Sequence, residues 1–405
     1  MRIMILCRVT AIILSCALYA SQAIAKTWHV PGDAATIQGG INLASANDTV
    51  LVACGIYYEY DIRMKSGVCL RSETGDASCV TIDAQQQDRV IYCRFVSNTA
   101  HIEGFTITGG FAENSFPLVY GNGGGLCCLD NSSPTVENCT ITGDSADWNG
   151  GGVYCGVNSS PTFINCTITG NSAPNGGSGM CFQENSDATM TDCTISDNFG
   201  DGIWVSSSSI FLQVTNCVFS GNSKSGIKCS SGSSVILTDC NFSDNSGGGA
   251  VAYGSSSPTF TNCTFSNNSS VRGGGMSITS NAIATLTSCA FTGNSAINDG
   301  GGIMLEDASA TLVDCSFTNN SAKNGGGVYL EGTSTLTADT TEFYNNTVSN
   351  EGARGFIGSG SEAILTCCVA DLSGFAGDGT ITLNNEGCFS PTEPTTWGRL
   401  KALYR

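Results

Sequence analysis

The stretch from Asn262 to Met276, NCTFSNNSSVRGGGM, contains the pattern that decides the fold. A cysteine is followed two places later by an aromatic or aliphatic residue, three places after that by an asparagine, and then by a glycine run. The cysteine recurs every 23 to 27 residues, at positions 139, 166, 193, 217, 240, 263, 289 and 315. A fixed period of this length indicates a stack of structural repeats.

Each repeat contains three short segments in which apolar and polar residues alternate, as at Met276 and Ile278 after the glycines. Alternation with period two is the signal of a strand, and the Gly, Asn, Ser and Pro residues between the segments mark turns. No segment is long enough for a crossover helix. We therefore predict an all-β fold, a right-handed parallel β-helix with three strands per turn. About 14 turns at roughly 4.8 Å each would give a rod on the order of 65 Å long.

The repeat also predicts where its characteristic residues lie. The cysteine and the residue two places later should point inward and form columns along the core. The asparagines should stack at one corner, where left-handed backbone is tolerated, and glycines should occupy the next corner. The predicted column of asparagines consists of Asn171, Asn198, Asn222, Asn245, Asn268, Asn294, Asn320 and Asn346, with Asp144 standing in once.

Two motifs resemble a known family. Gly-Gly-Gly-Val at 325–328 and Phe-Thr-Asn-Asn at 317–320 are similar to the GG-[AILV] and F-x-x-N repeats of polymorphic outer-membrane proteins. The whole coil, over about 104–370, resembles the pectate-lyase-like β-helix superfamily. The resemblance implies the fold but says little about function, because this fold hosts many activities.

The chain divides into three parts. Residues 1–25 have the features of an export signal, with Arg2 and Arg8 near the start, an apolar run and a small-residue cleavage site at Ala23-Ile24-Ala25. Residues 26–390 form the predicted β-helix, with a short helix over 35–43 covering its open end. Residues 391–405 depart from the repeat and are interpreted as a C-terminal cap or a sorting segment. We expect an exported monomer at the cell surface or outside the cell, without a transmembrane segment in the mature chain.

The charge balance limits the partners. The formal net charge is −18 at pH 7, and removal of the signal with its two arginines would make it −20. A strongly acidic chain is a poor partner for nucleic acid or an anionic membrane. No cofactor is indicated, although the acidic surface would permit Ca²⁺.

The 22 cysteines fall into two groups. Most, including Cys367, occupy inward repeat positions, where a free thiol packs as a small apolar group. Side chains of in-register strands point in parallel, so we expect this column to stay reduced. Cysteines outside the regular repeat are better disulfide candidates, namely Cys54, Cys69, Cys79, Cys93 and Cys388.

Aromatic residues predicted to point outward are the candidates for ligand binding. Tyr154 and Trp204 occupy the outward position of strands two turns apart, a spacing that would suit sugar rings. Trp148 should lie on a neighbouring loop, and an insertion between two glycine runs carries further rings at Phe111, Phe116 and Tyr120. The alternative is that they are ordinary surface residues and that the loop packs on itself.

The sequence displays no catalytic motif. Lyases and hydrolases of polysaccharides need carboxylates grouped with a base or with each other. Here the acids are dispersed, and no acidic cluster meets an arginine or lysine on one face. Asp197 and Asp201, close to Trp204, are the best candidates for calcium or a sugar, and the alternative is that both are solvated turn residues.

The function predicted from these observations is a non-catalytic surface scaffold for adhesion or glycan binding, with a polysaccharide, a surface glycan or a protein on another cell as its partner. The main alternative is a polysaccharide lyase, hydrolase or epimerase of the pectate-lyase-like fold. A minor alternative is ice binding through paired threonines that flank the inward isoleucine on successive turns, as at Thr140/Thr142 and Thr167/Thr169.

Overall fold

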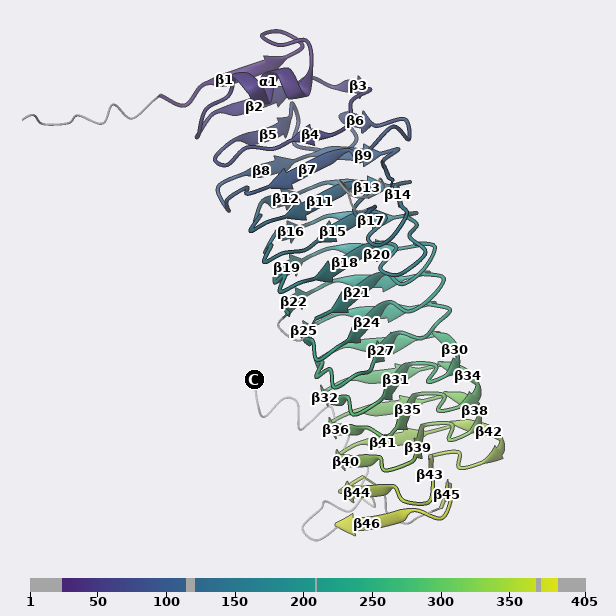
Figure 1. The fold of residues 1–405 in the computed structure, drawn as a ribbon. Helices are drawn as coiled ribbons and strands as arrows, with labels where there is room; N and C mark the ends of the chain where they lie inside the picture. Colours follow the sequence, from purple (N-terminus) through teal and green to yellow (C-terminus); the bar gives the residue numbers. More distant parts are fainter. Residues whose placement is uncertain (1–23, 114–120, 208–209, 369–372, 385–405) are drawn as a thin grey trace, which may run out of the picture.

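The computed structural model describes residues 24–113, 121–207, 210–368 and 373–384. The chain winds into a coil of parallel strands with about 13 turns, close to the 14 expected, and the predicted right-handed β-helix is confirmed (Figure 1). Each regular turn passes through three sheets in the same order, so every strand pairs with the equivalent strand of the turns before and after it. No helix in the described part of the chain is long and apolar enough to span a membrane.

The strands of the first two sheets follow one another directly in each turn. The 15-stranded sheet consists of β1 (Thr27–Val30), β2 (Thr49–Val52), β5 (Cys69–Ser72), β8 (His101–Glu103), β12 (Thr135–Glu137), β16 (Thr162–Ile164), β19 (Ala188–Thr191), β22 (Phe211–Thr215), β25 (Ser234–Thr238), β28 (Thr259–Thr261), β32 (Ile283–Thr287), β36 (Ser309–Val313), β40 (Thr335–Asp339), β44 (Glu362–Thr366) and β46 (Thr380–Asn384). The 12-stranded sheet consists of β3 (Gly55–Tyr57), β6 (Val80–Asp83), β9 (Phe105–Thr108), β13 (Thr140–Thr142), β17 (Thr167–Thr169), β20 (Thr194–Ser196), β23 (Val218–Ser220), β26 (Asn241–Ser243), β29 (Thr264–Ser266), β33 (Ala290–Thr292), β37 (Ser316–Thr318) and β41 (Glu342–Tyr344).

The third long sheet follows the glycine runs. This 13-stranded sheet consists of β4 (Ile62–Arg63), β7 (Ile91–Arg94), β11 (Leu126–Leu129), β15 (Val153–Cys155), β18 (Met180–Gln183), β21 (Ile203–Ser206), β24 (Ile227–Ser230), β27 (Ala250–Ala252), β31 (Met276–Thr279), β35 (Ile303–Glu306), β39 (Val328–Glu331), β43 (Gly355–Ile357) and β45 (Phe375–Ala376). Two small sheets lie before it in some turns, one of β10 (Phe111–Ala112) and β14 (Ser145–Ala146), and one of β30 (Ser269–Arg272), β34 (Ser295–Asp299), β38 (Ser321–Asn324) and β42 (Thr347–Glu351).

The core is built from columns of identical side chains. Phenylalanines two places after the repeat cysteine, or after Thr341 in its place, stack from turn to turn, with ring centroids 4.5 to 5.0 Å apart and nearly parallel planes. The strand spacing of about 4.8 Å imposes this distance, which is close to that of offset aromatic stacking. The members of the column are Phe219, Phe242, Phe265, Phe291, Phe317 and Phe343.

The predicted asparagine column is confirmed, but its backbone conformation differs from the prediction. Each buried amide oxygen accepts from the preceding ladder residue, as where Asn245 donates its Nδ2 and backbone N–H to Asn268 Oδ1 at 3.0 and 3.1 Å. The first asparagine, Asn171, accepts from the backbone N–H of Asp144. The left-handed residue is the one before each ladder asparagine, such as Asn267 with φ 55°. The chain turns at this preceding residue. The ladder asparagine itself therefore points into the core and keeps a negative φ.

Glycines fill the second corner for two reasons. Gly273 has φ 68°, a conformation that disfavours side chains. At Gly274 the backbone of the next turn is so close that a Cβ would lie 2.6 Å from the carbonyl oxygen of Gly301. The glycine run therefore serves tight stacking of the coil.

The cysteines agree with the prediction in part. All eight cysteines of the column from Cys139 to Cys315 are buried, and the structure joins none of them in a disulfide. Two turns after Cys315, the inward position of the column is occupied by Cys368 and not, as predicted, by Cys367. Cys315 Sγ and Cys368 Sγ each contact the carbonyl oxygen two residues earlier in the chain. Cys367 is disulfide-bonded.

The predicted disulfide candidates also divide. Cys54 and Cys79 form a disulfide with a Cα–Cα distance of 4.6 Å, whereas Cys69 and Cys93 are free and Cys388 lies outside the described residues. The paired residues stand immediately before Gly55 and Val80, which are register partners in the 12-stranded sheet. The argument that in-register cysteines cannot pair is therefore wrong, because rotation of the side chains brings the two sulfurs together.

A single helix, α1 (Ile37–Leu43), lies beside the first strands in the described part of the chain. Thr36 Oγ1 caps it by accepting from the N–H of Gly39 at 3.0 Å. The Glu59 carboxylate accepts from Ile37 N at 2.7 Å and from Gln38 N at 3.1 Å, so it satisfies two further free N–H groups of the helix terminus. Its role as a cap of the coil stays a prediction.

Candidate functional site

Outward side chains of the 13-stranded sheet form one continuous column. Strand residues alternate between the core and the outside, so the position after each first buried residue points outward. In-register pairing places these residues in one line along the coil, in the order Tyr92, Cys127, Tyr154, Cys181, Trp204, Lys228, Val251, Ser277, Met304, Tyr329 and Phe356. This column contains two of the predicted ligand-binding aromatics.

Tyr154 is in the predicted column, but the expectation that its ring is exposed is wrong. It is only 3% exposed and packs between Cys127 and Cys181. Its hydroxyl donates to Gln183 Oε1 at 3.3 Å, and burial raises its pKa well above the ordinary value. Segments leading into the glycine runs cover this part of the sheet, and a Cβ at Gly123 would lie 3.0 Å from Tyr154 Cβ.

Trp204 is partly covered by the same kind of segment. Its Nε1 donates to Ser230 Oγ at 3.1 Å, and the Lys228 ammonium lies 5.5 Å from the ring centroid. A Cβ at Gly176 would lie 2.2 Å from the indole, so the backbone there packs directly against the ring. Trp204 is therefore only partly accessible from outside the coil.

The remaining predicted aromatics differ in accessibility. Trp148 is 43% exposed, whereas Phe111 is half-buried in β10. Phe116 and Tyr120 lie outside the described residues. Glycan binding by any of these rings stays a prediction.

Asp197 and Asp201 have separate environments. The Asp201 carboxylate is buried and its Oδ1 accepts from Ser225 N at 3.2 Å and from Ser225 Oγ at 2.6 Å. Asp197 occupies a left-handed corner with φ 53°, the residue before ladder Asn198. Among the residues that the structure describes, no group of three or more His, Cys, Asp or Glu side chains is placed to hold a metal ion. The two contacts with Ser225 connect Asp201 to the next turn of the coil, and binding of calcium or a sugar at these aspartates stays a prediction.

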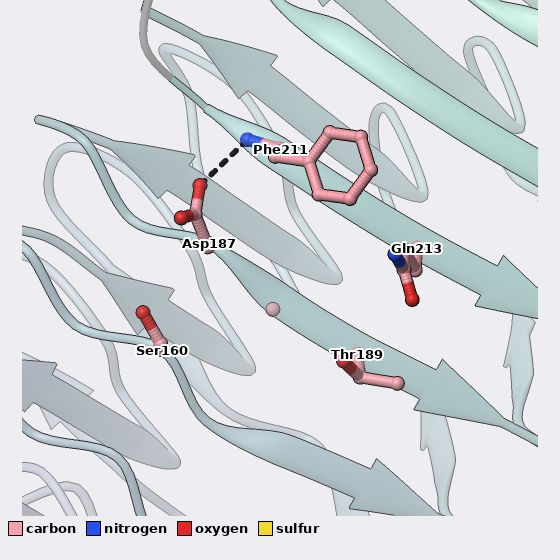
Figure 2. Close-up of a pocket in the computed structure, with 6 residues that line it drawn as sticks. Ser160, Asp187, Thr189, Phe211 and Gln213 are labelled. Atoms are coloured by element: carbon pink, nitrogen blue, oxygen red, sulfur yellow. Dashed lines mark hydrogen bonds between the residues drawn. The ribbon is translucent and has the colours of Figure 1, made fainter.

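A shallow pocket lies on the outer face of the 15-stranded sheet, where sequence reasoning placed no site (Figure 2). Its volume is about 140 Å³, and it is lined by Ser160, Asp187, Ala188, Thr189, Phe211 and Gln213. The Phe211 ring is 41% exposed, and the backbone N–H of Phe211 donates to Asp187 Oδ1 at 2.6 Å. In Figure 2 the Phe211 ring lies over its strand and points away from Asp187, whose carboxylate faces the Phe211 backbone nitrogen. Thr189 and Gln213 lie on the same face of the sheet.

The sequence did contain a signal for this pocket. In β22, FLQVT, the buried Leu212 and Val214 alternate with outward Phe211, Gln213 and Thr215. A phenylalanine at an outward position is unusual in this chain, whose equivalent positions on nearby strands are mostly serine or threonine. On strands, the prediction searched for outward aromatic residues only after the glycines and so missed Phe211.

A charged cluster lies farther along the coil. The Arg272 guanidinium contacts three carboxylates, with Nε 3.3 Å from Asp299 Oδ2, Nη1 2.8 Å from Glu306 Oε2, and Nη2 close to Glu331 Oε2. The Tyr329 ring centroid lies 5.9 Å from the guanidinium carbon. The statement that no acidic cluster meets a basic residue on one face is therefore wrong. Residues far apart in sequence meet because β30, β35 and β39 belong to consecutive turns.

The threonine pairs are also arranged as predicted. Thr140, Thr167 and Thr194 are register partners in the 12-stranded sheet, and the second row is Thr142, Thr169 and Ser196. The 15-stranded sheet carries similar pairs at Thr259/Thr261 and Thr285/Thr287. Exposed strands favour threonine in general, so ice binding stays a prediction.

Comparison with known proteins identifies the architecture. Among solved structures, the catalytic unit of a thermostable α-1,3-glucanase from Streptomyces thermodiastaticus is similar, with 15% identity, a TM-score of 0.52, and coverage of 89% of this chain and 67% of that chain. The surface adhesin PfbA of Streptococcus pneumoniae has 11% identity and a TM-score of 0.45, over 87% and 94% of the two chains. At these identities the likeness concerns the fold alone.

Sequence comparison gives the family. No curated protein sequence matches this chain. The family model described as the right handed beta helix region matches residues 89–265 and 249–387, which together include most of the chain. With the coil of parallel sheets described above, this match shows that the chain belongs to the right-handed β-helix family.

Proposed function

We propose that this chain is an exported, non-catalytic scaffold that binds a polysaccharide or surface glycan at the Phe211 pocket. The observation that carries the proposal is the combination of an exposed aromatic ring with a carboxylate, an amide and hydroxyls around one shallow pocket of about 140 Å³. Aromatic rings pack against the apolar face of a sugar, and the polar groups accept or donate hydrogen bonds to its hydroxyls.

The shape of the pocket suits one unit of a longer chain. Its volume lies below the roughly 300–1,000 Å³ typical of sites that enclose a small molecule. The pocket opens onto a long face of the 15-stranded sheet whose outward side chains are mostly polar, with Ile236 and Ile283 among them. A polymer would therefore contact the ring at one unit and the flat sheet at its neighbours.

Binding rather than catalysis is proposed because the pocket, as lined by the described residues, holds one carboxylate. Glycoside hydrolysis ordinarily requires two carboxyl groups on either side of the bond that is broken. Among the described lining residues, Asp187 alone is acidic, and its Oδ1 already accepts from the Phe211 backbone. Its second oxygen is suited to accept from a sugar hydroxyl.

Export is part of the proposal. It is supported by the signal-like pattern of residues 1–25 and by the disulfide between Cys54 and Cys79, since disulfides persist mainly in oxidising compartments. Location at the cell surface would place the long face where adhesion to a glycan, or to a protein of another cell, can occur. Fractionation of the native host and detection of the processed chain would test it.

The binding proposal is tested by affinity electrophoresis of purified protein in gels containing neutral, amino and acidic polysaccharides. We expect retardation by at least one polysaccharide, and about tenfold weaker binding for Phe211→Ala. Phe199→Ala is the matched control, because Phe199 is 69% exposed and belongs to a different corner of the coil. Equal retardation of the wild type, Phe211→Ala and Phe199→Ala would exclude the pocket as the binding site. If no polysaccharide retards the wild type, glycan binding itself would be excluded.

The alternative of an enzyme is favoured by one observation, the cluster at Arg272. Glu306 and Glu331 are register partners on adjacent strands, so their Cα atoms lie about one strand spacing apart, and both carboxylates contact the Arg272 guanidinium. Paired carboxylates also act in glycosidases that retain configuration. A product assay for new reducing and unsaturated ends, repeated with Glu306→Gln and Glu331→Gln, separates the two functions. Activity lost in both variants would establish the enzyme at this cluster.

A further inference from the structure

Eight cysteines occupy the same position of eight consecutive turns. They stand just before the strands of the 12-stranded sheet from β13 to β37, and register pairing of those strands places each cysteine directly beside the next. The column consists of Cys139, Cys166, Cys193, Cys217, Cys240, Cys263, Cys289 and Cys315, all at most 2% exposed and all free.

Neighbouring thiols of this column are in contact range. The backbone N–H of Cys193 donates to Cys217 Sγ at 3.3 Å, so the sulfur of one turn touches the cysteine of the turn before it. Equivalent Cα atoms on parallel strands are separated by about 4.8 Å, within the roughly 4.4–6.8 Å range that disulfides span.

The same sheet already contains such a cross-link. Cys54 and Cys79 precede β3 and β6, the first two strands of the 12-stranded sheet, and are joined across adjacent turns at a Cα–Cα distance of 4.6 Å. Their position is one residue before the position of the buried column, as the register of β6, β9 and β13 shows. The spacing between turns therefore permits a disulfide without a change of register.

We propose that the buried column is a site of covalent modification, in which cysteines of adjacent turns are oxidised in pairs to disulfides that cross-link the coil. The column is bounded by Phe105 and Thr341, so pairing without a remainder joins Cys139–Cys166, Cys193–Cys217, Cys240–Cys263 and Cys289–Cys315. Each bond joins two Sγ atoms and releases two protons and two electrons. The electrons pass to a disulfide-bearing exchange partner, which leaves as two thiols.

The modification must occur before a turn is buried. The thiolate is the reacting species, and an oxidant must reach its sulfur. Once the next turn has packed, each cysteine of the column is at most 2% exposed, so no oxidant reaches the sulfur. We therefore expect cross-links to form while successive turns add to the coil, and to resist reduction afterwards.

The chain also contains internal controls. Cys127 and Cys181 are equally buried, but they lie in the outward column of the 13-stranded sheet, two turns apart with Tyr154 between them. Two strand spacings exceed the distance that one disulfide can span. These two thiols should stay free under every folding condition.

The test uses protein that begins at Lys26 and compares two refolding conditions. One contains reduced glutathione alone, and the other contains a mixture of oxidised and reduced glutathione. After denaturation, free thiols are alkylated and disulfide-linked peptides are identified by mass spectrometry. We expect linked peptides from adjacent turns only in the oxidised sample, with Cys127 and Cys181 alkylated in both. The oxidised protein should unfold at least about 5 °C higher.

Two variants make the test specific. Cys240→Ala should remove one cross-link and leave Cys263 alkylated, whereas the double variant Cys240→Ala/Cys263→Ala should remove the cross-link without adding a free thiol. Complete alkylation of the eight wild-type cysteines after oxidative refolding would overturn the proposal, and this measurement does not depend on whether a variant folds. Linkage between non-adjacent turns would overturn it equally.

Discussion

Two regions of the coil are stabilised by different kinds of contact. One contains the later turns, from Cys217 to Asn346, and the other contains the first turns, from Thr27 to Glu103. The later turns repeat the same phenylalanine, asparagine and thiol in register, so each turn is stabilised by an identical neighbour. The first turns, all within the described residues, lack such columns and rely on individual contacts. One is the Asp48 carboxylate, which accepts from Lys26 N, Ser45 N and Trp28 Nε1 at 2.8, 2.9 and 3.1 Å.

The difference shows how repetition distributes stability. In a solenoid each repeat contacts only its neighbours, so a column transmits the loss of one member to the turns on both sides. In the first turns, a lost contact affects one place. Substitutions in the columns should therefore cost more than comparable changes among the first turns.

The largest effect is expected from Phe265→Ala. The ring is fully buried, with centroids of Phe242 and Phe291 at 4.8 and 4.5 Å. Loss of the burial and of both stacking partners should lower the free energy of unfolding by about 3–5 kcal/mol. Urea denaturation measures it, with the exposed Phe199→Ala as control at under about 0.5 kcal/mol. Equal effects of the two variants would contradict the role of the stack.

Asn268→Ala should be nearly as costly. Asn245 would lose the acceptor of its backbone N–H and Nδ2, and the carbonyl oxygen of Phe242 would lose the donor Nδ2 of Asn268, at 2.9 Å. Leaving buried groups without partners should lower the free energy of unfolding by about 3 kcal/mol. Hydrogen exchange should show lost protection on both adjacent turns. Loss confined to one turn would argue against transmission along the column.

Removal of the Cys54–Cys79 disulfide tests whether the first turns are stabilised by individual contacts. The bond closes a sequence separation of 25 residues, and its loss in Cys54→Ala/Cys79→Ala should lower stability by about 2–3 kcal/mol. Because this site lies outside the columns of the later turns, increased exchange should stay within the first turns. Spread of the effect beyond Asp144 would mean that the first turns are coupled to the repeats after all.

Asp144→Asn should raise the free energy of unfolding, by a smaller amount than the preceding substitutions lower it. Asp144 occupies the first position of the asparagine column and accepts from Gly110 N at 2.7 Å, while its Oδ2 has no hydrogen-bond partner among the described residues. An asparagine there would supply the amide donor that other ladder members give to the carbonyl of the preceding turn, as Asn171 does to Ile141 at 3.0 Å. We expect a gain of about 1–2 kcal/mol near pH 7.

The same substitution should change the pH dependence. Burial raises the pKa of the Asp144 carboxyl well above its ordinary value of 3.8. The folded state therefore binds this proton more tightly than the unfolded state, and stability falls as pH rises from 3.8 through the folded pKa. The amide introduced by Asp144→Asn cannot titrate, so the advantage of the variant should be larger at about pH 8 than at about pH 5. A constant difference would contradict a buried titrating carboxyl.

The sequence predicted the coil and its columns because a period of 23 to 27 residues repeats chemically distinct residues. It misassigned the left-handed corner because two asparagines, such as Asn267 and Asn268, stand side by side and either could turn the chain. It misjudged the exposure of Tyr154 because alternation gives the direction of a side chain but does not show whether a preceding segment covers it. The Cys54–Cys79 disulfide joins two of the predicted candidates. The argument that in-register cysteines cannot pair is wrong, because the register of two strands does not show how their side chains are rotated.

The candidate sites were harder to predict. The Arg272 cluster depends on turn lengths, since Arg272 and Glu331 are 59 residues apart and meet only when the intervening turns are in register. The Phe211 pocket combines residues from neighbouring turns, with Ser160, Asp187 and Phe211 each preceding or entering a strand of the 15-stranded sheet. Neither site is a local motif, so only the assembled coil displays it.

The most direct test of the central claim is a calorimetric titration of the polysaccharide that retards the wild-type protein. The account predicts measurable binding by the wild type and by Phe199→Ala, about tenfold weaker binding by Phe211→Ala, and unchanged unfolding of all three. Equal affinity of Phe211→Ala and the wild type would contradict glycan binding at this pocket.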